Sequence, residues 1–261
     1  MYIKKTYVTG KVIEVEKIYS RRYHPKNCSR SNRINPTSLE MLKVNERNAK
    51  KKLRRLINTN FEVGDYSLTL TYGEVNQTKD PEDAKKDLQK FIRKLRDKMH
   101  KEGQELKYVS VTEYGKNTIH HHLVIKKTAD PNIIQQCWTK GYVKFSPLRG
   151  EGDFSALSDY MLKQTCKSYE LSDEGVFKKR WNQSSNLVIP EPQIEVVGSD
   201  SWRSDPVVPQ GYQLIQDSLR VGVSDYTGYA YQHYRIVAIP RFRKKDRRRK
   251  RGTQKRCVKK Q

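Results

Sequence analysis

The spacing of apolar residues predicts a regular series of strands and helices through the middle of the chain. Residues 66–72 alternate as Tyr-Ser-Leu-Thr-Leu-Thr-Tyr and are rich in strand formers. From Asp80 onward, acidic residues followed by apolar residues at helical spacing predict a long amphipathic helix. Its buried stripe is expected to be Leu88, Phe91, Ile92, Leu95 and Met99.

Two further alternating runs follow this helix, at 107–114 and 118–126, and the Gly-Lys-Asn between them predicts a hairpin. A short helix at 130–138, a strand at 141–145 and a helix at 155–167 complete the order β-α-β-β-α-β-α. Strands that follow one another through hairpins, with helices interspersed, are typical of an α+β fold. We therefore expect an antiparallel β-sheet with helices on one face.

The flanking segments give weaker signals. Residues 1–36 are basic and interrupted by prolines, which favours an irregular arm. A Thr-x-x-Glu capping pattern at Thr37 then starts a helix reaching about residue 57. Its apolar positions are expected to face inward and its basic runs, at 50–52 and 54–55, outward. Residues 226–239 read as a loop that leads into a strand.

Charge divides the 261 residues differently from hydropathy. The net charge is +24, and residues 1–60 and 241–261 each contribute +12, so the 180 residues between them are neutral overall. A neutral body with two basic ends is typical of a protein that grips a polyanion, and nucleic acid is the leading partner. The basic residues of the tail chosen as DNA contacts are Arg243, Lys244, Lys245, Arg247, Arg248 and Arg249.

Composition also excludes some classes of protein. No apolar run approaches the length of a membrane span, and the first residues do not resemble a secretory signal, so an intracellular protein without membrane partners is expected. Four scattered cysteines form no CxxC pair, which argues against a zinc module or a disulfide framework.

The predicted hairpin brings three metal-ligating side chains together. Side chains alternate along a strand, so His120 and His122 share one face and His121 points the other way. If the turn centres on 116–117, Glu113 lies opposite His120. Two imidazoles and a carboxylate suit a divalent ion with open positions, and Mg²⁺ or Mn²⁺ is the plausible ion in a phosphate enzyme. The alternative is a polar surface patch.

The helix at 155–167 supplies a candidate nucleophile. Tyr160 and Lys163 lie at i, i+3 on one face, and Lys167 lies a further turn along, where it could contact DNA. Tyrosine becomes a nucleophile only when its proton is removed or the phosphate is strongly polarised. Taken alone, a Tyr-x-x-Lys pattern is weak, because a half-buried tyrosine beside a solvated lysine explains it equally well.

Together these patterns resemble the three motifs of the HUH endonucleases, in the order 68–72, then Glu113 with His120-His121-His122, then Tyr160 to Lys163. The likeness is greatest to rolling-circle replication initiators of single-stranded DNA phages, the group that includes the filamentous-phage initiator, and covers residues 50–240. One departure is His121, which stands where that motif usually has a hydrophobic residue.

The resemblance implies an HUH domain of the RRM-like, ferredoxin-like kind over 61–190. The basic arm and helix of 1–60 would precede it, an accessory segment of 191–240 would pack on it, and a disordered basic tail would occupy 241–261. It also implies that Glu113, His120 and His122 hold the ion, that Tyr160 becomes joined to a DNA 5′-phosphate, and that Lys163 steadies the site. Gln164 occupies the place of a second tyrosine, which favours a single-tyrosine mechanism.

The expected activity is metal-dependent nicking and rejoining of single-stranded DNA at a replication origin, in the cytoplasm of a bacterial host. A host polymerase would extend the freed 3′ end, and a host helicase would unwind the duplex because no P-loop motif is present. A non-enzymatic nucleic-acid-binding protein and a single-tyrosine HUH transposase remain as alternatives. Tyrosines near the C-terminal strand (226, 229, 231 and 234) and Trp202 could stack on bases, although core packing explains them equally well.

Overall fold

The computed structural model describes residues 1–20, 39–78, 80–114, 118–170, 180–197, 205–223 and 228–239, without the side chains of 39–42 and 164–170. The predicted turn at 115–117 and the tail residues Arg243, Lys244, Lys245, Arg247, Arg248 and Arg249 lie outside the described residues. Within them, no helix is both long and apolar enough to cross a membrane.

The middle of the chain forms the predicted series. Its elements are β3 (Tyr66–Tyr72), α2 (Pro81–Lys101), β4 (Tyr108–Tyr114), β5 (Ile119–Ile125), α3 (Pro131–Cys137), β6 (Gly141–Pro147) and α4 (Ser155–Glu170). With the short β7 (Asn182–Gln183), the strands form an antiparallel sheet in the order β6-β3-β5-β4-β7. The α+β fold class and the order of elements are confirmed.

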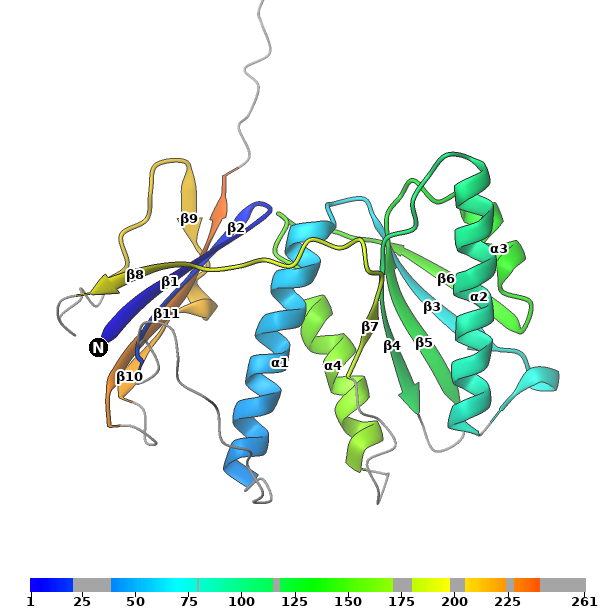
Figure 1. The fold of residues 1–261 in the computed structure, drawn as a ribbon, viewed down its shortest axis with the longest axis horizontal. Coiled ribbons are helices and arrows are strands. Elements are labelled where there is room, and N and C mark those ends of the chain that lie inside the picture. The colour runs from blue at the N-terminus through cyan, green and yellow to red at the C-terminus, as the bar shows by residue number, and fades with distance from the viewer. Residues whose placement is uncertain are drawn as a thin grey trace, which may run out of the picture.

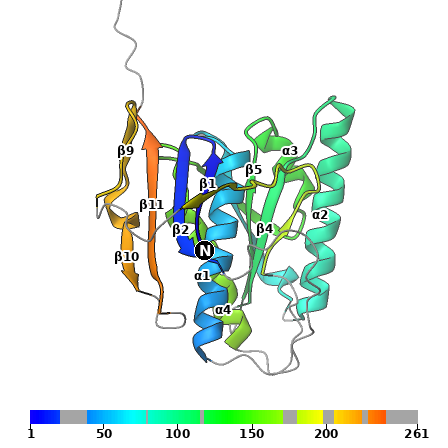
Figure 2. The ribbon, with the colours of Figure 1, turned by 60° about the vertical axis from the view of Figure 1, so that its left-hand side comes forward.

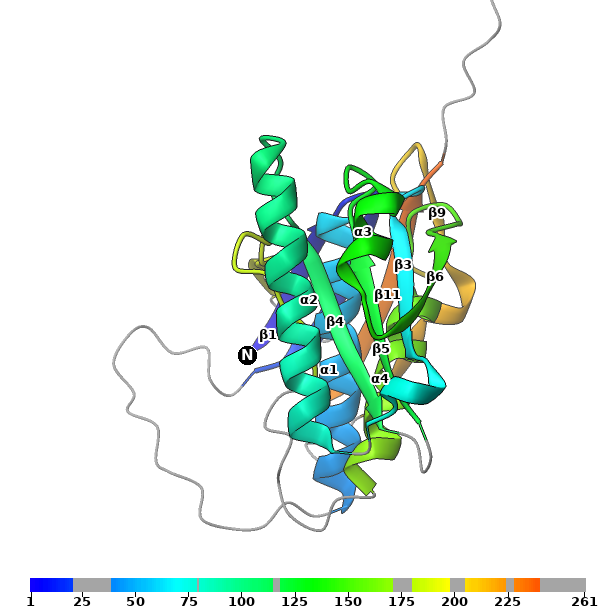
Figure 3. The ribbon, with the colours of Figure 1, turned by 90° about the vertical axis from the view of Figure 1, so that its right-hand side faces the viewer.

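Helices cover both faces of this sheet, whereas the sequence predicted one covered face. The first cluster packs α2 and α3 against Leu68, Leu70 and Leu123, and Figure 3 shows these helices in front of the strands. All five residues of the predicted α2 stripe are buried in it. The second cluster joins α4 and α1 (Leu39–Asn60) to Val109, Val111 and Val124 on the opposite face. Both faces are apolar because β4 and β5 are central strands, buried on each side.

Residues 1–20 are not an irregular arm. They form a hairpin of β1 (Tyr2–Thr9) and β2 (Val12–Tyr19), the start of a second antiparallel sheet. Its other strands come from the far end of the chain: β8 (Gln193–Val197), β9 (Tyr212–Leu214), β10 (Arg220–Val223) and β11 (Ala230–Ala238). The order is β10-β11-β2-β1-β8, with β9 also paired to β11, which confirms a strand after residue 229.

The two sheets lie on opposite sides of α1 and α4 (Figure 1), and the view in Figure 2 shows β1 and β2 beside α1. At the β1–β2 turn, Gly10 has φ +60°, and a Cβ there would lie 2.4 Å from the Asn58 carbonyl oxygen of α1. Glycine therefore allows the turn to sit directly on the helix. The segment 191–240 thus completes a sheet begun by the first twenty residues, an arrangement that the predicted division into arm and accessory segment did not contain.

Basic residues of α1 also depart from the prediction. Leu53, Leu56 and Ile57 are buried as expected, but Arg54 and Arg55 are buried as well, not turned outward. Their guanidinium groups each lie 2.7 Å from a carboxylate oxygen of Glu14 on β2. Arg55 also stacks on the ring of Tyr7, 3.5 Å from its centroid. The helix therefore has two buried sides, an apolar one toward the first sheet and a charged one toward the second.

Candidate metal and nucleophile site

The β4–β5 ladder has the register that the sequence predicted. Tyr114 pairs with Ile119 and Glu113 pairs with His120. Because directly paired residues share a face, Glu113, His120 and His122 all project to the side of the sheet that carries α4. The alternating strand and the register together therefore place all three predicted ligands on one face.

Contact distances distinguish these three residues. His122 is buried, its Nε2 lies 3.0 Å from Glu113 Oε2, and its Nδ1 lies 3.3 Å from the hydroxyl oxygen of Thr69 on β3. The ring is thus held from both nitrogens, with Nε2 directed at the carboxylate. His120 is their neighbour by strand pairing, but no hydrogen bond to its ring is found among the described residues, and its Nδ1 is buried.

Electrostatics keep the imidazole of His120 available as a ligand. Burial lowers the pKa of His120, with the charge of Glu113 acting in the opposite direction. A neutral imidazole has a lone pair to offer to a cation. The unpartnered buried nitrogen, the adjacent carboxylate and the second imidazole form a donor set that fits a divalent ion.

His121 has a different environment from its two neighbours. It is fully buried on the α2 side of the sheet, where Nε2 lies 3.1 Å from the Tyr72 hydroxyl and Nδ1 2.9 Å from the Thr112 hydroxyl. Burial lowers the pKa of His121 to about 3, so the ring is neutral at ordinary pH. A polar residue is accommodated at this core position because both ring nitrogens have hydrogen-bonding partners.

Tyr160 stands beside this group of ligands. Its ring meets that of His122 edge to face, with 5.4 Å between the centroids, and 47% of Tyr160 is exposed. The neighbouring Met161 and Leu162 are buried against the sheet, which fixes the side of α4 that Tyr160 occupies. Lys163 is exposed on the next turn, whereas Lys167 lies in the part of α4 whose side chains are not described. The arrangement combines a solvent-accessible phenol with a candidate cation site.

Comparison with known proteins supports this grouping. Residues 65–165 match the family model of the replication-associated protein ORF2 and its phage counterparts. The resemblance to rolling-circle replication proteins is confirmed for this segment. The segment runs from β3 into α4 and so contains Glu113, His120, His122, Tyr160 and Lys163. No curated protein and no solved structure matched the chain.

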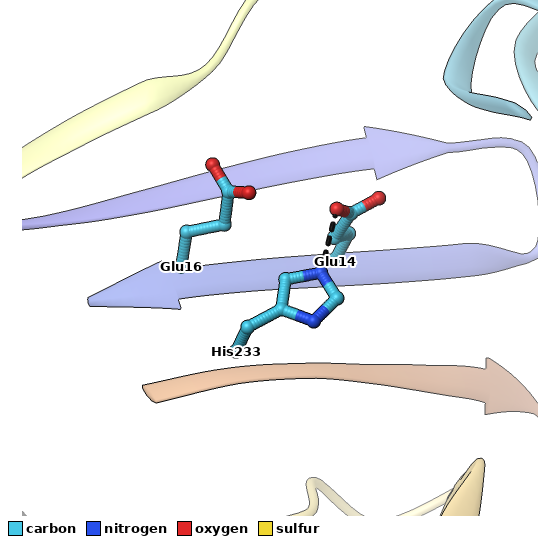
Figure 4. A group of neighbouring side chains, drawn as sticks. All are labelled: Glu14, Glu16 and His233. Carbon is cyan, nitrogen blue, oxygen red and sulfur yellow. Dashed lines mark hydrogen bonds and ion pairs between the residues drawn. The ribbon is translucent and has the colours of Figure 1, made fainter. Parts of the chain in front are cut away.

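A second cluster of ligand-type side chains was not foreseen. Glu14, Glu16 and His233 have ligand atoms within 4.8 Å of one another, and this is the only such trio found among the described residues (Figure 4). Glu113, His120 and His122 are thus less tightly gathered. The Glu14 carboxylate, however, is already bound by Arg54, Arg55 and His233, and Glu16 by Lys51 and Arg55. These cations neutralise the carboxylates, so the cluster is an internal ion-pair network between β2, β11 and α1.

The aromatic residues proposed for base stacking are arranged differently from the prediction. Tyr234 is buried in the core of the second sheet, and Tyr229 stacks on Tyr19 with 3.6 Å between ring centroids. Residues 226 and 202 lie outside the described part of the chain. The exposed aromatic residue that sequence reasoning missed is Tyr142 on β6, which is 75% exposed. Its alternation with Val143 and Phe145 was a usable signal, but its neighbours follow only from the pairing of β6 with β3.

Proposed function

We propose that the chain is a replication initiator that nicks and rejoins single-stranded DNA through Tyr160. The observation that carries this proposal is the edge-to-face contact between Tyr160 and His122, which is itself bonded to Glu113, inside the segment that matches a replication-associated family. A phenol exposed to solvent next to a cation-ligand group is what attack on a phosphodiester requires.

The cation would be held by Glu113, His120 and His122. A bound Mg²⁺ or Mn²⁺ would polarise the scissile phosphate and shield its charge. The Thr69 hydroxyl orients His122 from its second nitrogen, as outer-shell partners of metal ligands do. Lys163, one turn from Tyr160 and exposed, would add positive charge beside the phosphate.

In the proposed reaction, the phenol of Tyr160 loses its proton to solvent and its oxygen forms a bond to phosphorus. The bond from phosphorus to the 3′ oxygen breaks in line, and that oxygen takes up a proton. The products are a 5′-phosphotyrosine and a free 3′-hydroxyl, and the reverse step rejoins the strand. A host polymerase would extend the hydroxyl and a host helicase would open the duplex at the origin.

A covalent-adduct assay tests this proposal. Wild type, Tyr160→Phe and the control Tyr212→Phe, on the second sheet, are incubated with labelled single-stranded origin DNA and Mn²⁺, then run on a denaturing gel. We expect a shifted band with wild type and the control, and none with Tyr160→Phe or with chelator, while Tyr160→Phe still binds DNA. A band that persists in Tyr160→Phe would reject the nucleophile, and one that persists in chelator would reject the metal.

The same assay separates the competing functions. Salt-sensitive binding by wild type with no covalent band on any origin sequence would favour a non-enzymatic nucleic-acid-binding protein. A single-tyrosine transposase would give the same band and the same loss in Tyr160→Phe, but on DNA from the ends of a mobile element.

A further inference from the structure

Two rows of side chains extend from the candidate site across the sheet to its edge. In one row, Tyr142 on β6 pairs with Thr71 on β3, Thr71 with His120, and His120 with Glu113. In the next row, Lys144 pairs with Thr69 and Thr69 with His122. Paired residues share a face, so Tyr142 and Lys144 stand on the face of the candidate ligands, about 10 Å away at two strand spacings.

This edge of the face is open, in contrast to the part over β4 and β5. The apolar cluster under α1 and α4 takes its strand residues from β4 and β5, none from β3 or β6. On β3 the residues of this face are Ser67, Thr69 and Thr71, all polar, and on β6 Tyr142 and Lys144 are both exposed. We call the surface made by Thr69, Thr71, Tyr142 and Lys144 the β6 shelf.

The β6 shelf is rigidly built. Seven residue pairs join β6 to β3, and the alternate residues Val143 and Phe145 pack into the core under α2 and α3 (Figure 3). At the start of β6, a Cβ on Gly141 would lie 2.2 Å from the Thr71 carbonyl oxygen, so the two backbones approach more closely than any other residue allows. The Tyr142 ring therefore projects from a fixed backbone, although nothing in the described residues covers it.

We propose that the β6 shelf binds single-stranded DNA beside the scissile phosphate, with a base stacked on Tyr142 and the backbone contacted by Lys144. This proposal rests on the proposed function, because the position of the shelf is defined relative to Tyr160 and His122. An exposed aromatic next to a lysine is the combination that sequence-tolerant single-strand binding uses.

Charge favours nucleic acid as the occupant. Neither β3 nor β6 contains an Asp or Glu, and Lys144 has no acidic partner among the residues that the structure describes. A duplex does not present an open base face to Tyr142, since its bases are stacked on one another. A strand whose bases are unpaired can offer such a face while its phosphates lie along Lys144.

Anisotropy titrations with labelled oligothymidylate of about 16 nucleotides, the upper end of the site size of single-strand-binding folds, test the shelf. Full-length wild type, Tyr142→Ala, Tyr142→Phe, Lys144→Ala and the control Lys85→Ala are compared over a series of salt concentrations. Lys85 is an exposed lysine on α2, on the far side of the sheet. Because Tyr142 is exposed, its variants are expected to keep the melting temperature of wild type, which each preparation checks.

We expect Tyr142→Ala to bind about 5- to 100-fold more weakly at every salt concentration, with an unchanged salt slope, because stacking releases no counterions. Tyr142→Phe should bind like wild type. Lys144→Ala should lower the slope of log K against log salt by about 0.7, and Lys85→Ala should leave it unchanged. The loss in Tyr142→Ala should be absent with the same sequence as a duplex.

Two outcomes would overturn the shelf. One is wild-type affinity of Tyr142→Ala for single strands; the other is a change of oligomeric state in Tyr142→Ala with unchanged affinity, which would make β6 a self-association edge. Failure of the shelf is separable from failure of the proposed function. A covalent band from Tyr142→Ala with normal binding rejects only the shelf, whereas weakened binding by Tyr142→Ala with no covalent band from wild type rejects only the nicking activity.

Discussion

Consecutive histidines on β5 have opposite roles because strand side chains alternate. His120 and His122 face α4 and the candidate nucleophile, and His121 is enclosed on the α2 side by Tyr72 and Thr112. The lowered pKa of His121 means that it adds no positive charge behind the site at neutral pH. The run of three histidines thus places two candidate ligands on one face while the third is a neutral, hydrogen-bonded core residue.

The Thr69 hydroxyl provides the sharpest test at the scale of single residues. Thr69→Val keeps the shape of the side chain and removes the group that lies 3.3 Å from His122 Nδ1. We expect the Mn²⁺ concentration for half-maximal adduct formation to rise about 10- to 100-fold, the usual cost of losing an outer-shell partner. Thr71→Val is the control on the same strand and face. Equal metal dependence in both variants would show that Thr69 does not position His122.

At the scale of elements, α1 joins the two sheets through unlike chemistry. Toward the first sheet it presents Leu53, Leu56 and Ile57. Toward the second it presents Arg54 and Arg55, whose charges are matched by Glu14 and Glu16 on β2. Removing one member of such a buried network leaves uncompensated charge in a low dielectric, so the network makes the docking of α1 specific to this hairpin.

Glu14→Gln tests that joint. The variant removes the carboxylate that binds Arg54, Arg55 and His233, and we expect the free energy of unfolding at pH 7 to fall by about 3–5 kcal/mol. Urea denaturation measures the change. Glu62→Gln, at a 3.8 Å surface pair with Lys127, should change it by less than about 1 kcal/mol. Similar losses in the two variants would contradict a special role for Glu14.

The same variant should alter the acid limb of stability. Burial raises the pKa of Glu14, but the hydrogen bond from His233 and the charges of Arg54 and Arg55 outweigh burial and hold the pKa well below its usual range. As the pH falls below about 4.5, the unfolded state therefore takes up a proton before the folded state, and wild type loses stability. Glu14→Gln should lose less stability between pH 5 and pH 2, at about those bounds, in denaturation curves measured across that range.

At the scale of the whole molecule, sequence patterns predicted what is local. The β4–β5 register, the α2 stripe and the order of elements follow from alternation and helical spacing within short segments. The second sheet could not be predicted in this way, since β2 pairs with β11 more than two hundred residues later. The burial of Arg54 depends likewise on Glu14, forty residues away, and the position of Tyr142 on β6 pairing with β3.

The segment 61–190, predicted as the catalytic domain, ends up dependent on α1. Without residues 1–60 it lacks Leu53, Leu56 and Ile57, which are at most 4% exposed, and it uncovers Val109, Val111 and Val124 beneath them. We expect this fragment to bind a hydrophobic dye and to unfold in urea without a sharp transition, because one face of its sheet is bare. Fragment 39–190 restores the apolar cover and should unfold more cooperatively, even though Arg54 and Arg55 then face solvent. A transition in 61–190 as sharp as that of the full chain would mean that α1 belongs to the second sheet alone.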